Sequence, residues 1–514
     1  MTKIKILCLA ILISFTACTK QEIPQVEKWE VYEITLQGPK EGNPFMEIDL
    51  NATFNMEESE ITVPGFYDGN GIYKIRFSPE NVGNWTYSTT SNSELLDGKK
   101  GKLTCVEAQD KNHGPLIIVN TYYLQYADGT PFYSIGTTAY QWTSVKQKIQ
   151  EKTLETLKKA PFNKIRMCVF PKTYKYGNDT EPWAYPFLRK GEESDFTELN
   201  FEFFQNFDLR IKQLLEMGIQ ADVILFHPYD KWGYCQMGNE MNLRYVKYMI
   251  ARIGAFRNVW WSLANEWDVP EIKETIDWEA IGNCLQENDP HQRFRGIHNW
   301  YNTEDHFYDH NRPWITHTST QTSQFFNAIK WREQYKKPLL FDEMRYEGDV
   351  KSGWGNMSSE EMASYFWMAG LSGGYPTHGD TYANTADDST EVRWWAKGGL
   401  LVGKSPERIA FFKSVMEQAP VTEMVPELND GGEPENINNN IYKFSKQGEY
   451  YLIYVADNIA NIEVKLPEDM EFEAEIIDTW NMKISPVQGK FKGLSKIDLP
   501  EKPYMAIRLT KISN

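Results

Sequence analysis

Cysteine is scarce in this sequence, with six residues among 514, and no two of them form a Cys-x-x-Cys pair. None has the spacing of a zinc site, so the cysteines do not indicate a metal centre. An exported protein can form disulfides, but the sequence does not reveal their pairing. Outside the N-terminal segment we expect single buried thiols at Cys105, Cys168, Cys235 and Cys284.

Positive charge is also in deficit. Lysine and arginine number 54 against 71 aspartates and glutamates, which gives a net charge of −17. An acidic chain repels polyanions, so nucleic acid is not an expected partner. Aromatic residues are frequent, with 17 tryptophans, 28 tyrosines and 27 phenylalanines. Because their flat faces suit sugar rings as well as protein cores, a neutral carbohydrate fits this composition.

The apolar run at the N-terminus, from Ile6 to Phe15, is too short to span a membrane permanently. A basic start before it and a small residue after it are typical of a signal peptide, here over residues 1–17, so we expect export. Phe15-Thr-Ala-Cys18 resembles a bacterial lipobox. The resemblance implies lipidation of Cys18, a polar tether over residues 18–26 and anchoring to the bacterial outer membrane, on its periplasmic or cell-surface face. An ordinary secretory signal is the alternative.

Short alternating apolar runs separated by turn residues fill residues 27–110 and predict an antiparallel β-sandwich. The segments GFYDGNGIYKIRFSP (65–79) and GNWTY (83–87) resemble the N-terminal immunoglobulin-like domain of a group of Bacteroidetes lipoproteins. Those lipoproteins carry a clan A glycosidase barrel behind that domain. The same alternation returns over residues 421–514 and predicts a second β-sandwich at the C-terminal end.

Between these regions, over residues 111–420, apolar strands alternate with amphipathic helices, which is typical of βα units. The expected strands are Phe132–Thr137, Lys164–Phe170, Ala221–His227, Val259–Asn265, Arg293–His298, Trp314–Thr318, Leu339–Glu343 and Gly373–Thr377. Eight strands in a segment of this size predict a (β/α)8 TIM barrel. A doubly wound α/β sheet is disfavoured because no glycine-rich phosphate turn follows the first strand.

Glutamates stand at the ends of two expected strands, in WWSLANEW (260–267) and PLLFDEMR (338–345). In such barrels the active site lies at the carboxyl ends of the strands. Glycoside hydrolysis requires one carboxyl group that protonates the leaving oxygen and one carboxylate at the anomeric carbon. The pattern resembles clan A, family 5-like retaining glycoside hydrolases. The resemblance implies that Glu266 is the acid/base, that Glu343 is the nucleophile, that Asn265 holds the sugar 2-hydroxyl, and that no metal or cofactor takes part.

The same resemblance implies further substrate-binding residues. Arg166 matches the arginine that neutralises the nucleophile, while His227, His298 and His317 are expected to end the third, fifth and sixth strands and to bind sugar hydroxyls. The sequence departs from the family at His317, where a tyrosine often touches the nucleophile. Tyr346, shortly after the nucleophile, is a candidate for that phenol.

The loops add candidate sugar contacts. Asp230 and Trp232 follow the third strand, and Trp394, beside Trp395, follows the eighth. The segment from Gly373 to Tyr382 resembles the last-strand segment of apiosidase-like and endoglucanase-like relatives. The aromatic-rich loop from Pro171 to Asn200 is expected to form a wall of the cleft.

Taken together, the sequence predicts an O-glycosyl hydrolase acting on a plant or host polysaccharide or oligosaccharide. Two alternatives stay open. One is a non-catalytic glycan-binding surface lipoprotein, against which the presence of both glutamates argues. The other is a metal-dependent barrel hydrolase, which is disfavoured because the first strand has no His-x-His pair. That enzyme would use several histidines, namely His298, His306, His310, His317 and His378. The sugar, its linkage and exo or endo action cannot be derived from the sequence.

Overall fold

A computed structural model describes residues 23–512, apart from 174–175, 177–180, 302, 388–389 and 428–439. The expected signal peptide and Cys18 lie outside the described residues. Within the described ranges, no helix is long and apolar enough to cross a membrane. Cys105, Cys168, Cys235 and Cys284 are buried free thiols.

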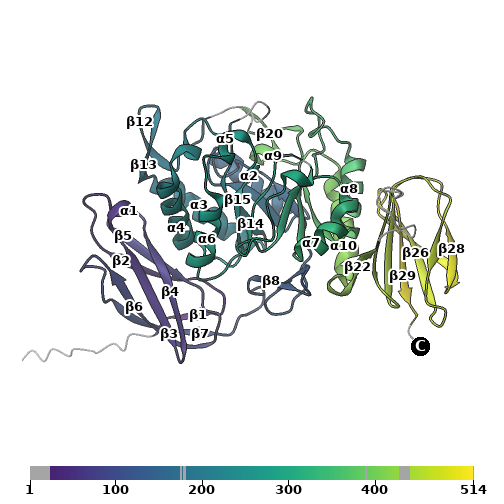
Figure 1. Ribbon diagram of the computed structural model, residues 1–514, viewed down its shortest axis with the longest axis horizontal. Coiled ribbons are helices and arrows are strands. Elements are labelled where there is room, and N and C mark those ends of the chain that lie inside the picture. The colour runs from purple at the N-terminus through teal and green to yellow at the C-terminus, as the bar shows by residue number, and fades with distance from the viewer. Residues whose placement is uncertain are drawn as a thin grey trace, which may run out of the picture.

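The central part of the chain forms a TIM barrel, as the sequence predicts (Figure 1). Eight strands pair in parallel in the order β16-β15-β14-β11-β10-β19-β18-β17. The backbone N–H of Thr316 donates to the carbonyl of Arg295 at 2.9 Å, which joins the two end strands and closes the ring. The strands are β10 (Gly136–Thr138), β11 (Lys164–Cys168), β14 (Gln220–Phe226), β15 (Val259–Ala264), β16 (Arg295–Gly296), β17 (Thr318–Gln321), β18 (Leu339–Glu343) and β19 (Gly374–His378).

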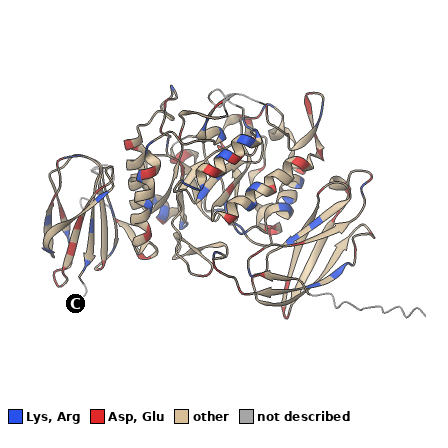
Figure 2. Cartoon of the chain, turned by 180° about the vertical axis from the view of Figure 1, so that it is seen from behind, with Lys and Arg blue, Asp and Glu red and all other residues tan. Residues whose placement is uncertain are grey.

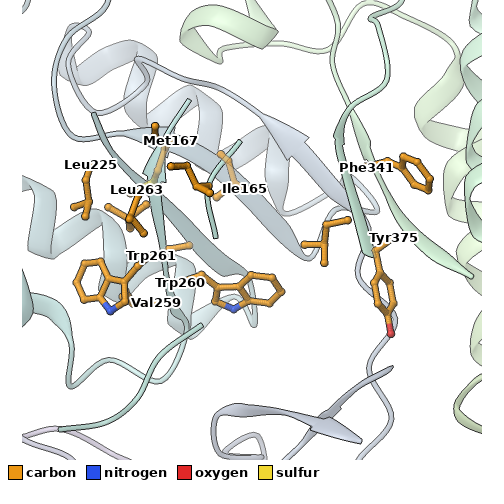
Figure 3. Close-up of a cluster of buried hydrophobic side chains, with 14 of the residues drawn as sticks. Ile165, Met167, Leu225, Val259, Trp260, Trp261, Leu263, Phe341 and Tyr375 are labelled. Carbon is orange, nitrogen blue, oxygen red and sulfur yellow. The ribbon is translucent and has the colours of Figure 1, made fainter. Parts of the chain in front are cut away.

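Apolar residues occupy both faces of these strands because helices cover the outside of the barrel. Figure 3 shows Ile165 and Met167 of β11 close to Leu263 of β15, and all three are fully buried. Trp260 and Trp261, also on β15, bury large aromatic side chains on opposite sides of the strand. The strands that end at the candidate site therefore rest on a tightly packed core.

The helices have an apolar face toward the barrel and a charged face toward solvent. In α3 the buried side chains include Phe203, Phe207, Ile211 and Leu214. Gly218, just beyond the helix, adopts a φ of +70°, which ends the helical conformation. Both acidic and basic residues occur along the helices around the barrel (Figure 2). The main helices are α2 (Gln147–Leu157), α3 (Phe201–Glu216), α4 (Asn239–Ile253), α6 (Trp278–Asn288), α7 (Ala328–Tyr335), α8 (Ser359–Leu371) and α10 (Ser405–Gln418), and the short ones are α1 (Pro44–Glu47), α5 (Pro270–Lys273) and α9 (Trp394–Lys397).

The N-terminal β-rich region lies against helices α3 and α4 of the barrel (Figure 1). Its seven-stranded sheet has the order β1-β7-β6-β3-β4-β5-β2. Buried ion pairs link it to the barrel, since Asp208 of α3 contacts Arg76 at 2.8 Å and Arg252 at 2.9 Å. Arg252 also reaches Asp68 at 2.8 Å. The strands are β1 (Gln25–Glu27), β2 (Tyr32–Gln37), β3 (Leu50–Met56), β4 (Ser59–Tyr67), β5 (Ile72–Phe77), β6 (Gly83–Ser91) and β7 (Lys100–Val106).

The C-terminal β-rich region lies on the opposite side of the barrel (Figure 1). A six-stranded sheet, β22-β23-β24-β29-β26-β27, packs on the two-stranded pair β25-β28 around a shared apolar core. Tyr454 stacks on Trp367 of α8 and donates to Ser364 Oγ at 2.7 Å, which fixes the sheet to the barrel. The strands are β22 (Val425–Glu427), β23 (Ile441–Lys446), β24 (Tyr450–Val455), β25 (Asn461–Lys465), β26 (Phe472–Asp478), β27 (Lys483–Phe491), β28 (Leu494–Asp498) and β29 (Met505–Lys511).

Several expected boundaries differ from the structure, since the first barrel strand begins at Gly136 rather than at Phe132 and the fifth is confined to Arg295–Gly296. The sixth barrel strand begins at Thr318 rather than at Trp314, because Trp314 packs on Gly282 of α6 and donates to Glu279 at 3.1 Å. The expected tether also ends earlier, since Gln25 already pairs with β7. The remaining strands form hairpins: β8 (Leu116–Val119) with β9 (Tyr123–Tyr126), β12 (Phe187–Lys190) with β13 (Glu193–Leu199), and β20 (Ala383–Asp387) with β21 (Thr390–Arg393).

Candidate active site

A cavity of about 490 Å³ opens at the carboxyl ends of the barrel strands, and both predicted catalytic glutamates line it. Its wall is mostly aromatic, with a few charged groups, which is the usual composition of a small-molecule site. The lining residues next to the glutamates are Tyr140, Lys172, Tyr229 and Tyr346. The other lining residues are Tyr176, Trp300, Tyr301, Gln321, Thr322, Ser323, Met344, Arg345, Trp354 and Trp395.

Glu266 follows β15 with its backbone in the left-handed region, at φ +61°. A glutamate rarely adopts this conformation, and such strain occurs mainly at functional sites. Hydrogen bonds hold the residues on either side, from Asn265 N–H to Phe226 at 3.0 Å and from Trp267 N–H to His298 at 2.9 Å. The Glu266 side chain is buried, and its Oε2 has no hydrogen-bond partner among the described residues.

Glu343 is the last residue of β18 and is also buried. The hydroxyl of Tyr140 donates a short hydrogen bond to its Oε1 and lies 3.2 Å from the hydroxyl of Tyr346. The Tyr346 hydroxyl also favours the charged form of the Glu343 carboxyl group, because it lowers the pKa of Glu343 against the rise caused by burial. Two phenols thus converge on this carboxylate, as expected for a group that carries negative charge.

The surroundings of Glu266 and Glu343 favour the protonated form of the carboxyl group to different extents. Burial, followed by repulsion from Glu343, raises the pKa of Glu266 to about 8, although Lys172 and Tyr229 oppose the rise. Burial also raises the pKa of Glu343, but the Tyr140 hydrogen bond and the nearby cations counteract it. Because more stabilising groups face the charged form of Glu343, we assign the negative charge to Glu343 and the proton to Glu266.

Arg166 forms no ion pair with Glu343, but its positive charge still favours the ionised form of that glutamate, in keeping with the role implied by the sequence. Its guanidinium pairs with Asp222 at 3.2 Å and with Asp342 at 3.1 Å. Burial lowers the pKa of Arg166, but these two carboxylates outweigh it and keep the guanidinium charged. The Arg166 Nη2 also lies 3.5 Å from Asn265 Oδ1, so Arg166 orients the residue next to Glu266. Asn265 Nδ2 is buried and has no partner in the described part of the chain.

The three predicted strand-end histidines are buried beneath the cavity rather than in its lining. His227 Nε2 bonds to the carbonyl of Phe170 at 3.0 Å. His317 precedes β17 and packs on Trp260, so it is not at a strand end at all. Burial lowers the pKa of His227 to about 3 and that of His317 to about 4, and it lowers the pKa of His298 well below its usual range. The prediction that these histidines bind sugar hydroxyls is therefore wrong, because none of them lines the cavity.

Three loop residues that were predicted to contact sugar lie outside the cavity lining. Asp230 accepts backbone hydrogen bonds from Trp232 at 2.7 Å and Cys235 at 2.9 Å, so it shapes its own loop. Trp232 is buried, and its indole N–H donates to Glu181 at 3.3 Å. Trp394 is buried beside β10 and donates to Thr137 at 2.9 Å. None of these three side chains lines the cavity.

Other aromatic residues form the cavity wall instead. Trp395 and Trp354 lie 5.2 Å apart, and Tyr176 and Tyr346 pack on Trp354 at 5.8 and 5.9 Å between ring centres. Trp300 and Tyr301 form a second aromatic group beyond β16, with ring centres 4.5 Å apart. Trp300 is tied to the acid/base loop, because its backbone N–H donates to Asp268 at 2.5 Å. Aromatic groups therefore lie near both glutamates.

Sequence reasoning missed Tyr140, Lys172 and Tyr229 as site residues. Each follows a barrel strand, namely β10, β11 and β14, so strand-end position was a usable signal. The described residues give no comparable indication of a metal site. Among the residues that the structure describes, no group of three or more His, Cys, Asp or Glu is placed to hold a metal ion.

Sequence comparison matches residues 119–402 to the family described as "Apiosidase-like, catalytic domain". Residues 25–92 and 440–510 match two domains of unknown function, DUF5060 and DUF5605. No curated protein matches the chain.

Among solved structures, a candidate glycoside hydrolase from Bacteroides vulgatus ATCC 8482 is 35% identical, with a TM-score of 0.86 over 95% of this chain and 100% of that one. A glycoside hydrolase family 5 protein from the same organism is 16% identical, with a TM-score of 0.62 over 78% of this chain and 93% of its own. Another glycoside hydrolase is 15% identical, with a TM-score of 0.59 over 78% and 97%. The latter two are similar in fold alone.

Proposed function

Since this chain belongs to the apiosidase-like family and has a clan A type glycoside hydrolase fold, we propose that it hydrolyses O-glycosidic bonds with retention of configuration. Its substrate class is a plant or host polysaccharide or oligosaccharide. The observation that supports the mechanism best is the unequal hydrogen bonding of two buried glutamates in one cavity. Two phenols face Glu343, whereas Glu266 keeps a carboxyl oxygen without a partner among the described residues.

In the first step, the Glu343 carboxylate attacks the anomeric carbon while the bond from that carbon to the leaving oxygen breaks. Glu266 donates its proton to the leaving oxygen, and a glycosyl ester forms on Glu343. As Glu343 loses its charge, Glu266 gains one, so the repulsion that raised the pKa of Glu266 disappears when the group must act as a base.

In the second step, the Glu266 carboxylate removes a proton from water, whose oxygen attacks the same carbon and displaces Glu343. The phenols of Tyr140 and Tyr346 then stabilise the carboxylate that returns. The unpartnered amide N–H of Asn265 is a suitable donor for the sugar 2-hydroxyl. The aromatic walls supply faces on which sugar rings can stack.

The test is a screen of residues 23–514 against 4-nitrophenyl glycosides, polysaccharides and oligosaccharides. We expect turnover on at least one substrate, its loss in Glu343→Gln, and no change in Glu155→Gln, which alters an exposed glutamate of α2. Binding of glycans without turnover would instead support the surface glycan-binding alternative. Loss of activity in EDTA that zinc restores would support the metal-dependent alternative.

A further inference from the structure

The ammonium group of Lys172 lies between two tyrosine rings in the catalytic cavity. Its Nζ is 4.1 Å from the ring centre of Tyr140 and 4.7 Å from that of Tyr229. These distances fall in the range of favourable cation–π contacts. The side chain is 3% exposed, so water screens its charge only weakly. One buried cation therefore contacts tyrosines from the loops after β10 and β14.

Each of these tyrosines hydrogen-bonds a different glutamate. Tyr140 donates to Glu343, and Tyr229 lies in hydrogen-bonding contact with Glu266. The connection therefore runs from Glu343 through Tyr140, Lys172 and Tyr229 to Glu266. A cation over the face of a phenol draws electron density from the ring and makes its hydroxyl a stronger donor. Lys172 can thus act on both carboxyl groups at once through their donors.

We propose that Lys172 is the positioning residue of the glutamate pair: its ammonium holds Tyr140 and Tyr229 in place as donors and favours negative charge on both carboxyl groups. The inference rests on the proposed function, because it assigns Lys172 a task within that mechanism. The charge effect agrees with the geometry, since Lys172 lowers the pKa of Glu266 and of Glu343 against the rise caused by burial.

A second link fixes this arrangement in the backbone. The N–H of Thr173 donates to the carbonyl of Tyr229 at 2.9 Å, so the loop that carries Lys172 is bound to the loop that carries Tyr229. The ammonium is therefore placed by main-chain contacts as well as by the rings. A hydrophobic residue at position 172 can keep these contacts, which allows charge and packing to be separated by experiment.

Other titratable or charged groups also face the two glutamates, and they limit how far the loss of Lys172 can shift the two pKa values. Around Glu343 these are Tyr140, Tyr346 and Arg166, and around Glu266 they are Tyr229 and Asp268. The groups next to Lys172 itself are Cys168, His227 and His298. Burial raises the pKa of Cys168 to about 12 and lowers that of His227 to about 3, so both stay uncharged near neutral pH. Lys172 is thus a cation that acts on both glutamates.

The experiment compares the pH dependence of kcat/KM for the wild type and four variants, using the 4-nitrophenyl glycoside that the wild type hydrolyses best. Lys172→Met should move both limbs of the profile upward by about one pH unit, because each carboxyl group loses a nearby opposite charge. Lys172→Arg should restore both limbs. Tyr140→Phe should move the acidic limb more than the basic limb, and Tyr229→Phe should do the reverse.

A substrate-free measurement accompanies these profiles. Carbon-13 titration of the glutamate side-chain carboxyl groups, assigned with Glu266→Gln and Glu343→Gln, should show both pKa values rising in Lys172→Met. If neither value moves, or if Lys172→Arg behaves like Lys172→Met, the inference is wrong even in an active enzyme. If the wild type hydrolyses no glycoside, the proposed function fails, while the titration still tests the effect of Lys172 on the two carboxyl groups.

Discussion

At the scale of single residues, hydrogen bonding distinguishes two glutamates that both follow barrel strands. Glu343 accepts a hydrogen bond from Tyr140 and lies near the phenol of Tyr346, while Glu266 sits on a strained backbone and has a carboxyl oxygen without a partner among the described residues. Similar carboxyl groups thereby acquire different proton affinities, which is how one site can supply both an acid and a nucleophile.

The first prediction separates their roles by leaving group. Glu343→Ala should lower kcat/KM for every glycoside by at least about 10⁴-fold, because both steps use that carboxylate. Glu266→Ala should cost about 10²–10⁴-fold on substrates with a sugar leaving group, which need protonation. Substrates with an activated phenol should keep much of their first-step rate, which a stopped-flow burst of nitrophenol would measure.

Azide provides the control for that prediction. Added azide should accelerate the slow second step of Glu266→Ala by attacking the glycosyl ester, and the product should be a glycosyl azide of retained configuration. Azide should not rescue Glu343→Ala in the same way. Equal losses for both variants on all leaving groups would contradict the assigned roles.

The second prediction concerns pH. Glu266 must be protonated to act as an acid, so kcat/KM should fall as the pH rises through its pKa of about 8. Glu343 must be ionised, so activity should also fall at low pH, below its raised pKa. The basic limb should be absent from the burst rate of Glu266→Ala on activated phenyl glycosides. A wild-type basic limb near the ordinary carboxyl value, about 4–5, would contradict the burial argument.

Both predicted glutamates line the cavity, and the sequence could place them there because each stands at the end of a largely apolar barrel strand. The sequence could not predict that Arg166 pairs directly with Asp222 and Asp342, since these pairings depend on distances across the barrel. Tyr140 and Lys172 were missed although both follow barrel strands, because they lie two and four residues beyond the ends of β10 and β11 rather than directly at them.

At the scale of secondary structure, a buried charge cluster joins three barrel strands beneath the cavity. Lys164 and Arg166 of β11 contact Asp222 of β14 and Asp342 of β18 at 2.5–3.2 Å. Burial raises the pKa of Asp342, but the two cations outweigh it and hold the pKa far below its usual range. Asp342 directly precedes Glu343, so this cluster fixes the strand that carries the nucleophile.

The third prediction tests that cluster. Asp342→Asn leaves two buried cations facing one carboxylate and should lower the free energy of unfolding by about 3–5 kcal/mol. Urea denaturation followed by tryptophan fluorescence measures the change. Asp305→Asn, at an exposed position, is the matched control and should alter stability by less than about 0.5 kcal/mol. A loss for Asp342→Asn no larger than that of the control would show that the cluster does not hold β18.

Strand positions were predicted more reliably than strand boundaries. All eight barrel strands overlap the expected segments, and strands such as β14 and β15 were easy to recognise because fully buried parallel strands tend to have a continuous apolar sequence. The sixth was displaced because Trp314 and Ile315 are apolar but are buried against a helix rather than in the sheet. Burial alone does not specify a strand, and His317 was misplaced as a consequence.

At the scale of the whole molecule, the barrel is fixed between two β-rich regions by specific buried contacts. Asp208 forms ion pairs with Arg76 of the N-terminal region and with Arg252 of α4. The stacked pair Tyr454 and Trp367 joins the C-terminal region to α8. These contacts fix both β-rich regions relative to the barrel.

The fourth prediction concerns the lipid anchor at Cys18, which we propose from the lipobox-like sequence alone. Cys18→Ser should release the protein from the membrane fraction of the native host without changing kcat/KM, since residue 18 belongs to the segment before the described structure. Fractionation and immunoblotting measure the distribution. A mature N-terminus beyond Cys18 without a lipid, as determined by mass spectrometry, would disprove the anchor.

The stereochemistry of hydrolysis tests the central claim most directly. Proton NMR of the first-formed sugar, recorded before mutarotation, gives its anomeric configuration. The two-glutamate mechanism predicts the same configuration as in the substrate, because Glu343 and water displace in turn at one carbon. An inverted product would mean that a water molecule stands between carboxyl groups about 6.5–9.5 Å apart, with Glu343 as a general base, and would contradict the account.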